Sequence, residues 1–168
     1  MAPLSFSAER SGKTGGGAVE KRLLGLDVGS RTIGVAVSDP LGITAQGVGV
    51  WRRKGREKDL AYLKEVCEAY DVGKIVVGLP LRTDSRKGPE AEEVERFARE
   101  IEAATGKPVV LWDERFTTRI AQRALIEAGL RRERRRELVD MTAAVLILQG
   151  YMERSETHDR ARRDDPGG

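Results

Sequence analysis

The segment from Leu23 to Asp39 reads LLGLDVGSRTIGVAVSD, two apolar runs joined by a short turn that contains a glycine. Apolar runs of this length, bounded by turn residues, predict two buried β-strands, one ending at Asp27 and the next running from Ile33 to Ser38. The sheet fixes the position of a residue at a strand end, while the turn leaves it reachable from solvent. Asp27 therefore lies where a carboxylate could bind a metal ion, with Arg31 on the turn beside it.

The rest of the chain alternates apolar segments of strand length with segments of helical periodicity. The predicted elements are, in chain order, a strand at Val48–Trp51, a helix from about Glu57 to Tyr70, a strand at Ile75–Leu79, a helix from about Glu90 to Gly106, a strand at Val109–Trp112, a helix carrying Ile120, Ala124, Leu125 and Ala128, and a helix from about Glu137 to Met152. A turn at Asp71-Val72-Gly73 is expected to separate the first helix from the strand that follows.

This order of elements predicts the sheet. Three strands joined by short turns form an antiparallel meander, and each strand–helix–strand connection forms a parallel, right-handed crossover. The expected architecture is an α/β fold with a mixed five-stranded sheet, three antiparallel strands plus two parallel ones, flanked by helices. The same order of elements is that of the RNase H-like fold.

The length of 168 residues suits one domain with a substantial core. Residues 1–20 are rich in Ser, Gly and Lys without apolar periodicity, so we expect a disordered N-terminal arm. Residues 21–153 are then the folded domain, and residues 154–168 a polar C-terminal tail. Since no apolar run approaches the roughly 20 residues that cross a bilayer, and no secretory signal is present, we expect a cytoplasmic protein.

Cysteine and histidine chemistry is nearly excluded by composition. The chain holds one cysteine, Cys67, and one histidine, His158, which lies in the polar tail. One cysteine forms no internal disulfide, and these two residues alone supply neither a zinc site nor a convincing nucleophile pair. The net charge of +3 is only a weak indication of an anionic partner. Carboxylates remain as the candidate reactive groups.

Acidic residues interrupt three otherwise apolar elements. Asp27 ends the first strand, Asp113 and Glu114 end the fifth, and Asp140 lies in the first turns of the last helix. Neighbouring strand residues point to opposite faces, so we expect only one of Asp113 and Glu114 to join a common cluster. Asp39, by contrast, precedes a proline and is expected to be a turn residue.

Carboxylates brought together at one edge of a sheet repel each other, and a divalent cation relieves that repulsion. Oxygen-only ligands favour Mg²⁺ or Mn²⁺, and two such ions about 4 Å apart can hydrolyse a phosphodiester bond. Each acid also has a simpler interpretation. Asp27 could stabilise its turn, and Asp113, Glu114 and Asp140 could each favour the start of a helix.

Basic and hydroxyl side chains flank the predicted acidic cluster and are candidates for binding phosphate. Those nearest to the acids in sequence are Arg31, Arg115, Thr117 and Thr118, and the polar loop after the fourth strand adds Arg82, Arg86 and Lys87. For any single arginine a solvated surface charge is the simpler interpretation, and the basic run at 131–136 carries little weight for the same reason.

Four blocks in this order resemble the YqgF/RuvX family of bacterial RNase H-like proteins over about Arg22 to Met152. The blocks are LGLDVGSRTIGVAVSD at 24–39, VGLPL at 77–81, DERFTT at 113–118, and VD at 139–140 leading into AAVLILQ at 143–149. The resemblance implies that Asp27, Glu114 and Asp140 are catalytic metal ligands, with Asp113 in reserve for the middle role. The related RuvC resolvases carry a glutamate on the fourth strand, where this chain has Val77–Pro80, so the fifth-strand acid would replace it.

The resemblance favours a Mg²⁺- or Mn²⁺-dependent endonuclease that processes the 5′ end of pre-16S rRNA. A Holliday junction resolvase acting as a homodimer is the alternative within that class. Two other classes stay open: a phosphatase or kinase-like protein, since the Asp27 turn resembles the phosphate loop of actin and sugar kinases, and a non-catalytic, ribosome-associated RNA-binding factor. The kinase fold needs two such domains around a cleft, more than this chain can hold.

Overall fold

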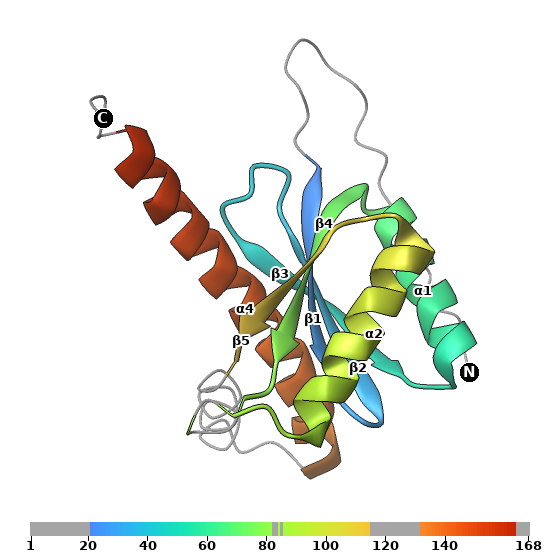
Figure 1. The fold of residues 1–168 in the computed structure, drawn as a ribbon. Coiled ribbons are helices and arrows are strands. Elements are labelled where there is room, and N and C mark those ends of the chain that lie inside the picture. Colours follow the sequence, from blue (N-terminus) through green and yellow to red (C-terminus); the bar gives the residue numbers. More distant parts are fainter. Residues whose placement is uncertain (1–20, 82–83, 85, 115–131, 164–168) are drawn as a thin grey trace.

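The computed structural model describes residues 21–81, 84, 86–114 and 132–163, with the side chains of 132–137 and 156–163 excepted (Figure 1). The predicted N-terminal arm, the helix expected around Ile120 to Ala128 and the last residues of the predicted tail lie outside the described residues.

A five-stranded mixed sheet forms the centre of the molecule, as predicted. Its strands are β1 (Arg22–Val28), β2 (Thr32–Ser38), β3 (Ala45–Arg52), β4 (Val72–Leu79) and β5 (Val109–Asp113). They lie in the order β3-β2-β1-β4-β5, in which β1–β2 and β2–β3 are antiparallel while β1–β4 and β4–β5 are parallel. The strand that carries Asp27 is therefore the central one.

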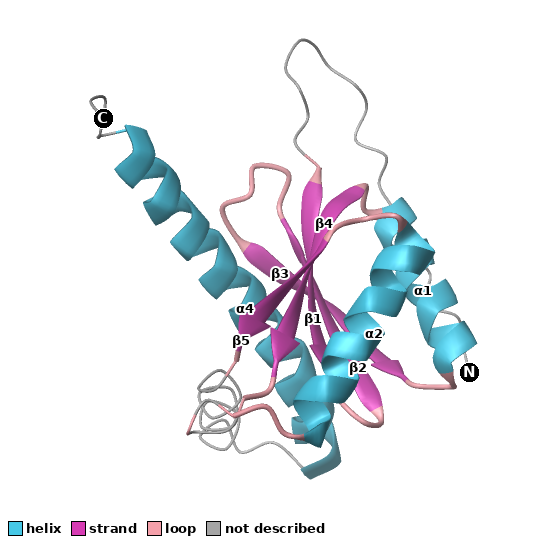
Figure 2. Cartoon of the chain, in the orientation of Figure 1, coloured by secondary structure: helices cyan, strands magenta, loops and turns pink. Residues whose placement is uncertain are grey.

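Helices cover both faces of this sheet. On one face lie α1 (Arg56–Ala69) and α2 (Pro89–Thr105), and on the other lies the long α4 (Arg132–Arg163) (Figure 2). The predicted bounds of α4 were wrong at both ends, because it starts before Glu137 and continues well past Met152. Its charged ends lack the apolar periodicity on which the prediction depended.

The alternation of side chains along β1 separates the core from the site. Leu24 and Leu26 are fully buried in the cluster formed with α1 and α2. Gly25 and Asp27 point the other way, towards α4. A Cβ placed on Gly25 would lie 2.7 Å from the Cβ of Leu148, so the glycine allows α4 to approach the sheet closely. The position of Asp140 on α4 depends on that close approach.

The turn before β4 is shorter than expected. Val72 and Gly73 belong to the strand, and Asp71 adopts a left-handed conformation, with φ of 51°.

Within the described ranges, no helix combines the length and the apolar character that crossing a membrane requires.

Candidate active site

Asp27 is the next-to-last residue of β1, half-buried and directed towards the face that α4 covers. Its antiparallel partner in β2 is Gly34. A Cβ on Gly34 would overlap the backbone carbonyl of Asp140. The missing side chain at Gly34 therefore places the first turns of α4, and with them Asp140, directly beside Asp27.

Glu114 follows β5 and reaches the same place. Its backbone N–H donates to the carbonyl of Leu79 at 3.3 Å, and the residue is only 9% exposed. The Glu114 and Asp27 carboxyl groups share a hydrogen bond, while the Oε2 atom of Glu114 is buried with no hydrogen-bond partner among the described residues. An unpaired buried carboxylate oxygen is costly, and a bound cation is one way to satisfy it.

Asp140 supplies the third carboxylate. The hydroxyl of Thr32, at the start of β2, donates a hydrogen bond to its Oδ2 atom. Its negative charge also acts on Asp27. The structure thus brings together Asp27, Glu114 and Asp140, which come from β1, from the residue after β5, and from α4.

Asp113 lies on the other face of β5. It pairs in register with Leu79 and is exposed, as strand alternation requires. Its charge raises the pKa of Glu114 without placing its own carboxylate in the cluster. We expected only one of Asp113 and Glu114 to lie beside Asp27 and Asp140. In the structure that residue is Glu114.

The pKa values reflect crowding of like charges in a buried place. Burial raises the pKa of Asp27 from 3.8 to about 8, and the neighbouring charges of Glu114 and Asp140 add to the effect. Burial likewise raises the pKa of Glu114. A site that holds a proton on Asp27 near neutral pH favours a cation that would replace that proton.

The donor set fits a hard divalent cation in its chemistry, since it offers only carboxylate and hydroxyl oxygens. Within the part of the chain that the structure describes, no three His, Cys, Asp or Glu side chains already stand in a metal-holding arrangement. Two of the acids are in contact and the third is engaged by Thr32. Asp27 and Glu114, with Asp140 beside them, are the residues that would hold the ion.

Comparison with known proteins places the chain in a family. Residues 21–154 match the family model of RuvX, described as Holliday junction resolvase. The chain belongs to the RuvX family. It is 51% identical over 132 residues to a protein of Syntrophomonas wolfei and 53% identical over 133 residues to one of Moorella thermoacetica. Both carry the name "Putative pre-16S rRNA nuclease", and the matches cover 79% of this chain and 94% and 95% of those proteins.

The fold is shared with more distant resolvases. Thermus thermophilus RuvC in complex with a Holliday junction substrate superposes with a TM-score of 0.53 at 16% sequence identity. The superposition covers 82% of this chain and 98% of that one. At this level of identity the likeness establishes the architecture alone.

Gly78 explains how this RuvX chain places an acid without a glutamate on β4. A Cβ at Gly78 would overlap Oε2 of Glu114 and would lie 2.5 Å from the Cδ1 atom of Ile147. The Glu114 carboxylate therefore occupies the space above β4 where a side chain of residue 78 would otherwise lie. The sequence analysis did not assign a role to Gly34 or Gly78, although a glycine inside a strand is a recognised signal of close approach.

Arg53 and Thr32 are two further residues whose roles the sequence did not reveal. Arg53 holds the β1–β2 turn, because its backbone N–H donates to Arg31 and its Nη1 donates to Gly29, each at 2.9 Å. Its Nε donates to the buried carboxylate of Asp59 at 2.9 Å. The turn that carries exposed Arg31 next to Asp27 is thereby fixed to the start of α1.

The other residues singled out in the sequence lie away from the three acids or outside the described residues. Asp39 is a turn residue as predicted, since its Oδ1 accepts hydrogen bonds from the backbone N–H groups of Ile43 and Thr44. Lys87 is paired with Glu95 of α2 at 2.5 Å, which reduces its availability for phosphate. Four predicted contact residues lie outside the described residues: Arg82, Arg115, Thr117 and Thr118.

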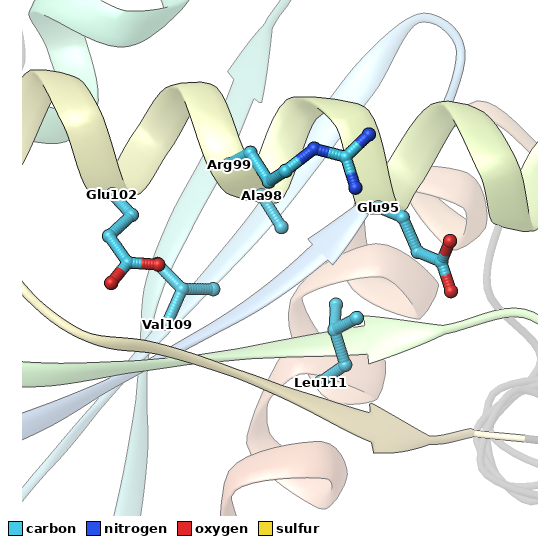
Figure 3. A pocket seen from close by; sticks show the side chains of 6 residues that line it. All are labelled: Glu95, Ala98, Arg99, Glu102, Val109 and Leu111. Atoms are coloured by element: carbon cyan, nitrogen blue, oxygen red, sulfur yellow. The ribbon is translucent and has the colours of Figure 1, made fainter.

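A hollow between α2 and β5 lies on the opposite face of the sheet (Figure 3). Its lining includes Glu95, Arg99 and Glu102 of α2 and the partly exposed Leu111 of β5. The negative charges of Glu95 and Glu102 would repel an anionic substrate in this hollow. Asp27, Glu114 and Asp140 lie on the other face of the sheet, which α4 covers. The hollow is therefore separate from the candidate active site.

Proposed function

We propose that this RuvX-family chain is a divalent-metal-dependent endonuclease that hydrolyses phosphodiester bonds in structured nucleic acid, with the 5′ end of pre-16S rRNA as its substrate. The observation that carries this proposal is the meeting of Asp27, Glu114 and Asp140 at the carboxyl end of the central strand. The names of the two relatives support the choice of substrate.

Asp27, Glu114 and Asp140 would hold Mg²⁺ or Mn²⁺, two ions being expected during catalysis. A divalent ion bound by carboxylates activates a water molecule and stabilises the leaving oxygen of a phosphodiester. Among the protein groups, Asp27 occupies a fixed place on the central strand, Glu114 reaches over Gly78, and Thr32 orients Asp140 through its hydroxyl. Arg31 lies exposed on the adjoining turn and would bind a phosphate of the substrate.

A matched pair of substitutions tests the proposal. Asp27→Asn should abolish cleavage of a precursor RNA with either metal, whereas Asp39→Asn should leave it intact, because Asp39 serves the β2–β3 turn at the other end of the sheet. Glu114→Gln and Asp113→Asn form a second pair, and only the first should lose activity. Full activity in Asp27→Asn would overturn the metal-site assignment.

A Holliday junction resolvase acting as a homodimer is the second candidate, favoured by the description of the family and by the shared fold with RuvC. Two symmetric cuts require two sites, so a resolvase is expected to dimerise. Parallel assays on a four-way DNA junction and a precursor RNA, with the oligomeric state measured by light scattering, distinguish the two substrates. Cleavage of the junction alone by a dimer would select the resolvase.

A non-catalytic RNA-binding factor is the remaining alternative. It predicts strong RNA binding without metal and no cleavage under any condition. Binding that survives Asp27→Asn and Asp140→Asn, together with no cleavage by the unsubstituted protein, would support that role against the nuclease.

A further inference from the structure

Four side chains form an aromatic–cation cluster between α4 and the strands β4 and β5: Lys74, Trp112, Tyr151 and Arg154. The rings of Trp112 and Tyr151 meet edge to face, with centroids 5.9 Å apart. The guanidinium of Arg154 lies 5.7 Å from the centre of the Trp112 ring, and Nζ of Lys74 lies 6.0 Å from that of Tyr151. The Trp112 ring thus has a cation within cation–π range, whereas Lys74 lies at the hydroxyl end of the Tyr151 ring.

The two cations of this cluster have no acidic partner among the described residues. Within the described residues, Lys74 and Arg154 contact the two rings, and Nζ of Lys74 also donates to the Tyr151 hydroxyl at 3.3 Å, but neither forms an ion pair. Lys87, by contrast, forms an ion pair with Glu95. The cluster therefore keeps two positive charges beside aromatic surface.

The cluster is partly open to solvent. Trp112, Tyr151 and Lys74 are half-buried and Arg154 is exposed. On its inner side Trp112 packs near Gly150, where a Cβ would lie 3.5 Å from the indole ring. The exposed Arg154 guanidinium lies over the same indole ring, so a planar group can stack on that guanidinium from the solvent side.

The cluster is adjacent to the candidate active site. Trp112 and Glu114 are two residues apart in sequence and face the same side, so their Cα atoms are about 7 Å apart if the chain stays extended. Along α4, the 11 positions from Asp140 to Tyr151 span about 16 Å. Figure 1 shows this helix lying across the sheet, with its C-terminal half extending beyond it. The acids and the cluster thus lie on the same face of the sheet, which α4 covers.

We propose that the aromatic–cation cluster binds a single-stranded segment of the nucleic acid next to the bond that is cut, an inference that rests on the proposed nuclease function. Bases stack on the rings of Trp112 and Tyr151, or on the Arg154 guanidinium. Lys74 and Arg154 bind the flanking phosphates. A purely structural role, in which the cluster only fastens α4 to β5, predicts no response to nucleic acid.

Tryptophan fluorescence gives a direct test that does not need cleavage. The chain has two tryptophans, so Trp51→Phe leaves Trp112 as the sole reporter, and the phenyl ring keeps the stacking of residue 51 on Tyr62. This variant is titrated in EDTA with octamers of uridine and of thymidine, and with a DNA duplex. Saturable quenching by the single strands, at concentrations where the duplex gives none, is the expected result.

Charge-removing substitutions complete the test in the Trp51→Phe background. Lys74→Met and Arg154→Met keep the aliphatic stems but remove the cations, and each should weaken binding about 5- to 10-fold and lower the salt slope by about 1. Lys64→Met, on the exposed side of α1, is the matched control and should change neither quantity. Circular dichroism checks that each variant is folded.

The outcomes separate this inference from the proposed function. Octamers that do not bind, that bind without quenching Trp112, or that bind Arg154→Met and Lys64→Met equally well would overturn the cluster as a binding site. Cleavage of precursor RNA by the same preparation in Mg²⁺ would show that the nuclease stands nevertheless. Conversely, quenching that depends on Arg154 in a protein without nuclease activity would remove only the catalytic proposal.

Discussion

Asp27 is an acid at a position where a negative charge is unfavourable and which the sheet holds fixed. Its carboxyl group is buried between Glu114 and Asp140, and it cannot move away because β1 is paired on both sides. The resulting rise in pKa to about 8 means that the folded protein keeps a proton that the unfolded chain releases near pH 4. Removing that proton therefore lowers the free energy of unfolding.

The stability of the protein in EDTA should therefore fall as the pH rises. Between the unfolded pKa of 3.8 and the folded pKa of about 8, the folded state binds more protons than the unfolded state, so the free energy of unfolding decreases with pH. Melting temperatures measured across this interval should decline, and Asp27→Asn should remove most of the decline. An identical decline in the variant would show that Asp27 does not carry the effect.

Thr32 acts on Asp140 through one hydroxyl group. Thr32→Val preserves the shape and the strand preference of the residue but removes the donor. We expect a loss of about 1–2 kcal/mol in the free energy of unfolding and a fall of about 10- to 100-fold in cleavage rate or metal affinity. The exposed Thr44 in the β2–β3 turn provides the control, since Thr44→Val leaves Asp140 untouched. Equal activity of the two variants would exclude a positioning role for Thr32.

The contact between α4 and the sheet depends on glycines, and two of them differ in what they face. Gly34 lies under the backbone of Asp140, whereas Gly47 lies under the side chain of Met141, whose Sδ atom would be 2.7 Å from an added Cβ. A backbone cannot move without shifting the helix, but a methionine side chain can change its conformation. The same substitution at the two positions should thus give different results.

Gly34→Ala should destabilise the protein by about 2–3 kcal/mol through overpacking, and Gly47→Ala by less than about 1 kcal/mol. Because the displaced turn carries Asp140, the first variant should also lose cleavage activity, while the second should keep it. Denaturant unfolding and a cleavage assay on both variants measure the two effects. A similar cost at both positions would mean that α4 adjusts its distance from the sheet freely.

The sequence predicted the sheet well because apolar periodicity and short turns are local properties. It also predicted that one acid of Asp113 and Glu114 would join the others, since strand alternation is local too. Which one joins depends on the register of β5 with β4, and on the space left by Gly78, which are set by tertiary contacts. The role of Thr32 and the true length of α4 depend on such contacts or on charged residues without periodicity, so the sequence did not reveal them.

The three acids connect parts of the molecule that are distant in the chain. Asp27 lies on the central strand, Glu114 follows an edge strand, and Asp140 lies on the helix that covers the second face. Repulsion between them opposes the assembly of these parts, and a cation that bridges them would favour it. Metal binding should therefore increase the free energy of unfolding of the whole domain and not of one element alone.

Mg²⁺ or Mn²⁺ at about 100 times its Kd should stabilise the folded state by about 2.7 kcal/mol, visible as a higher melting temperature than in EDTA. Asp27→Asn should have opposite effects on the two measurements: it raises stability in EDTA at neutral pH, because the amide is buried without having to take up a proton, and it abolishes the increase caused by metal. Asp39→Asn should behave as the unsubstituted protein in both, because its carboxylate serves a turn. A full metal-induced increase in Asp27→Asn would place the cation elsewhere, and a loss of stability in EDTA would show that the hydrogen bond between Asp27 and Glu114 outweighs the cost of burying the Asp27 carboxyl group.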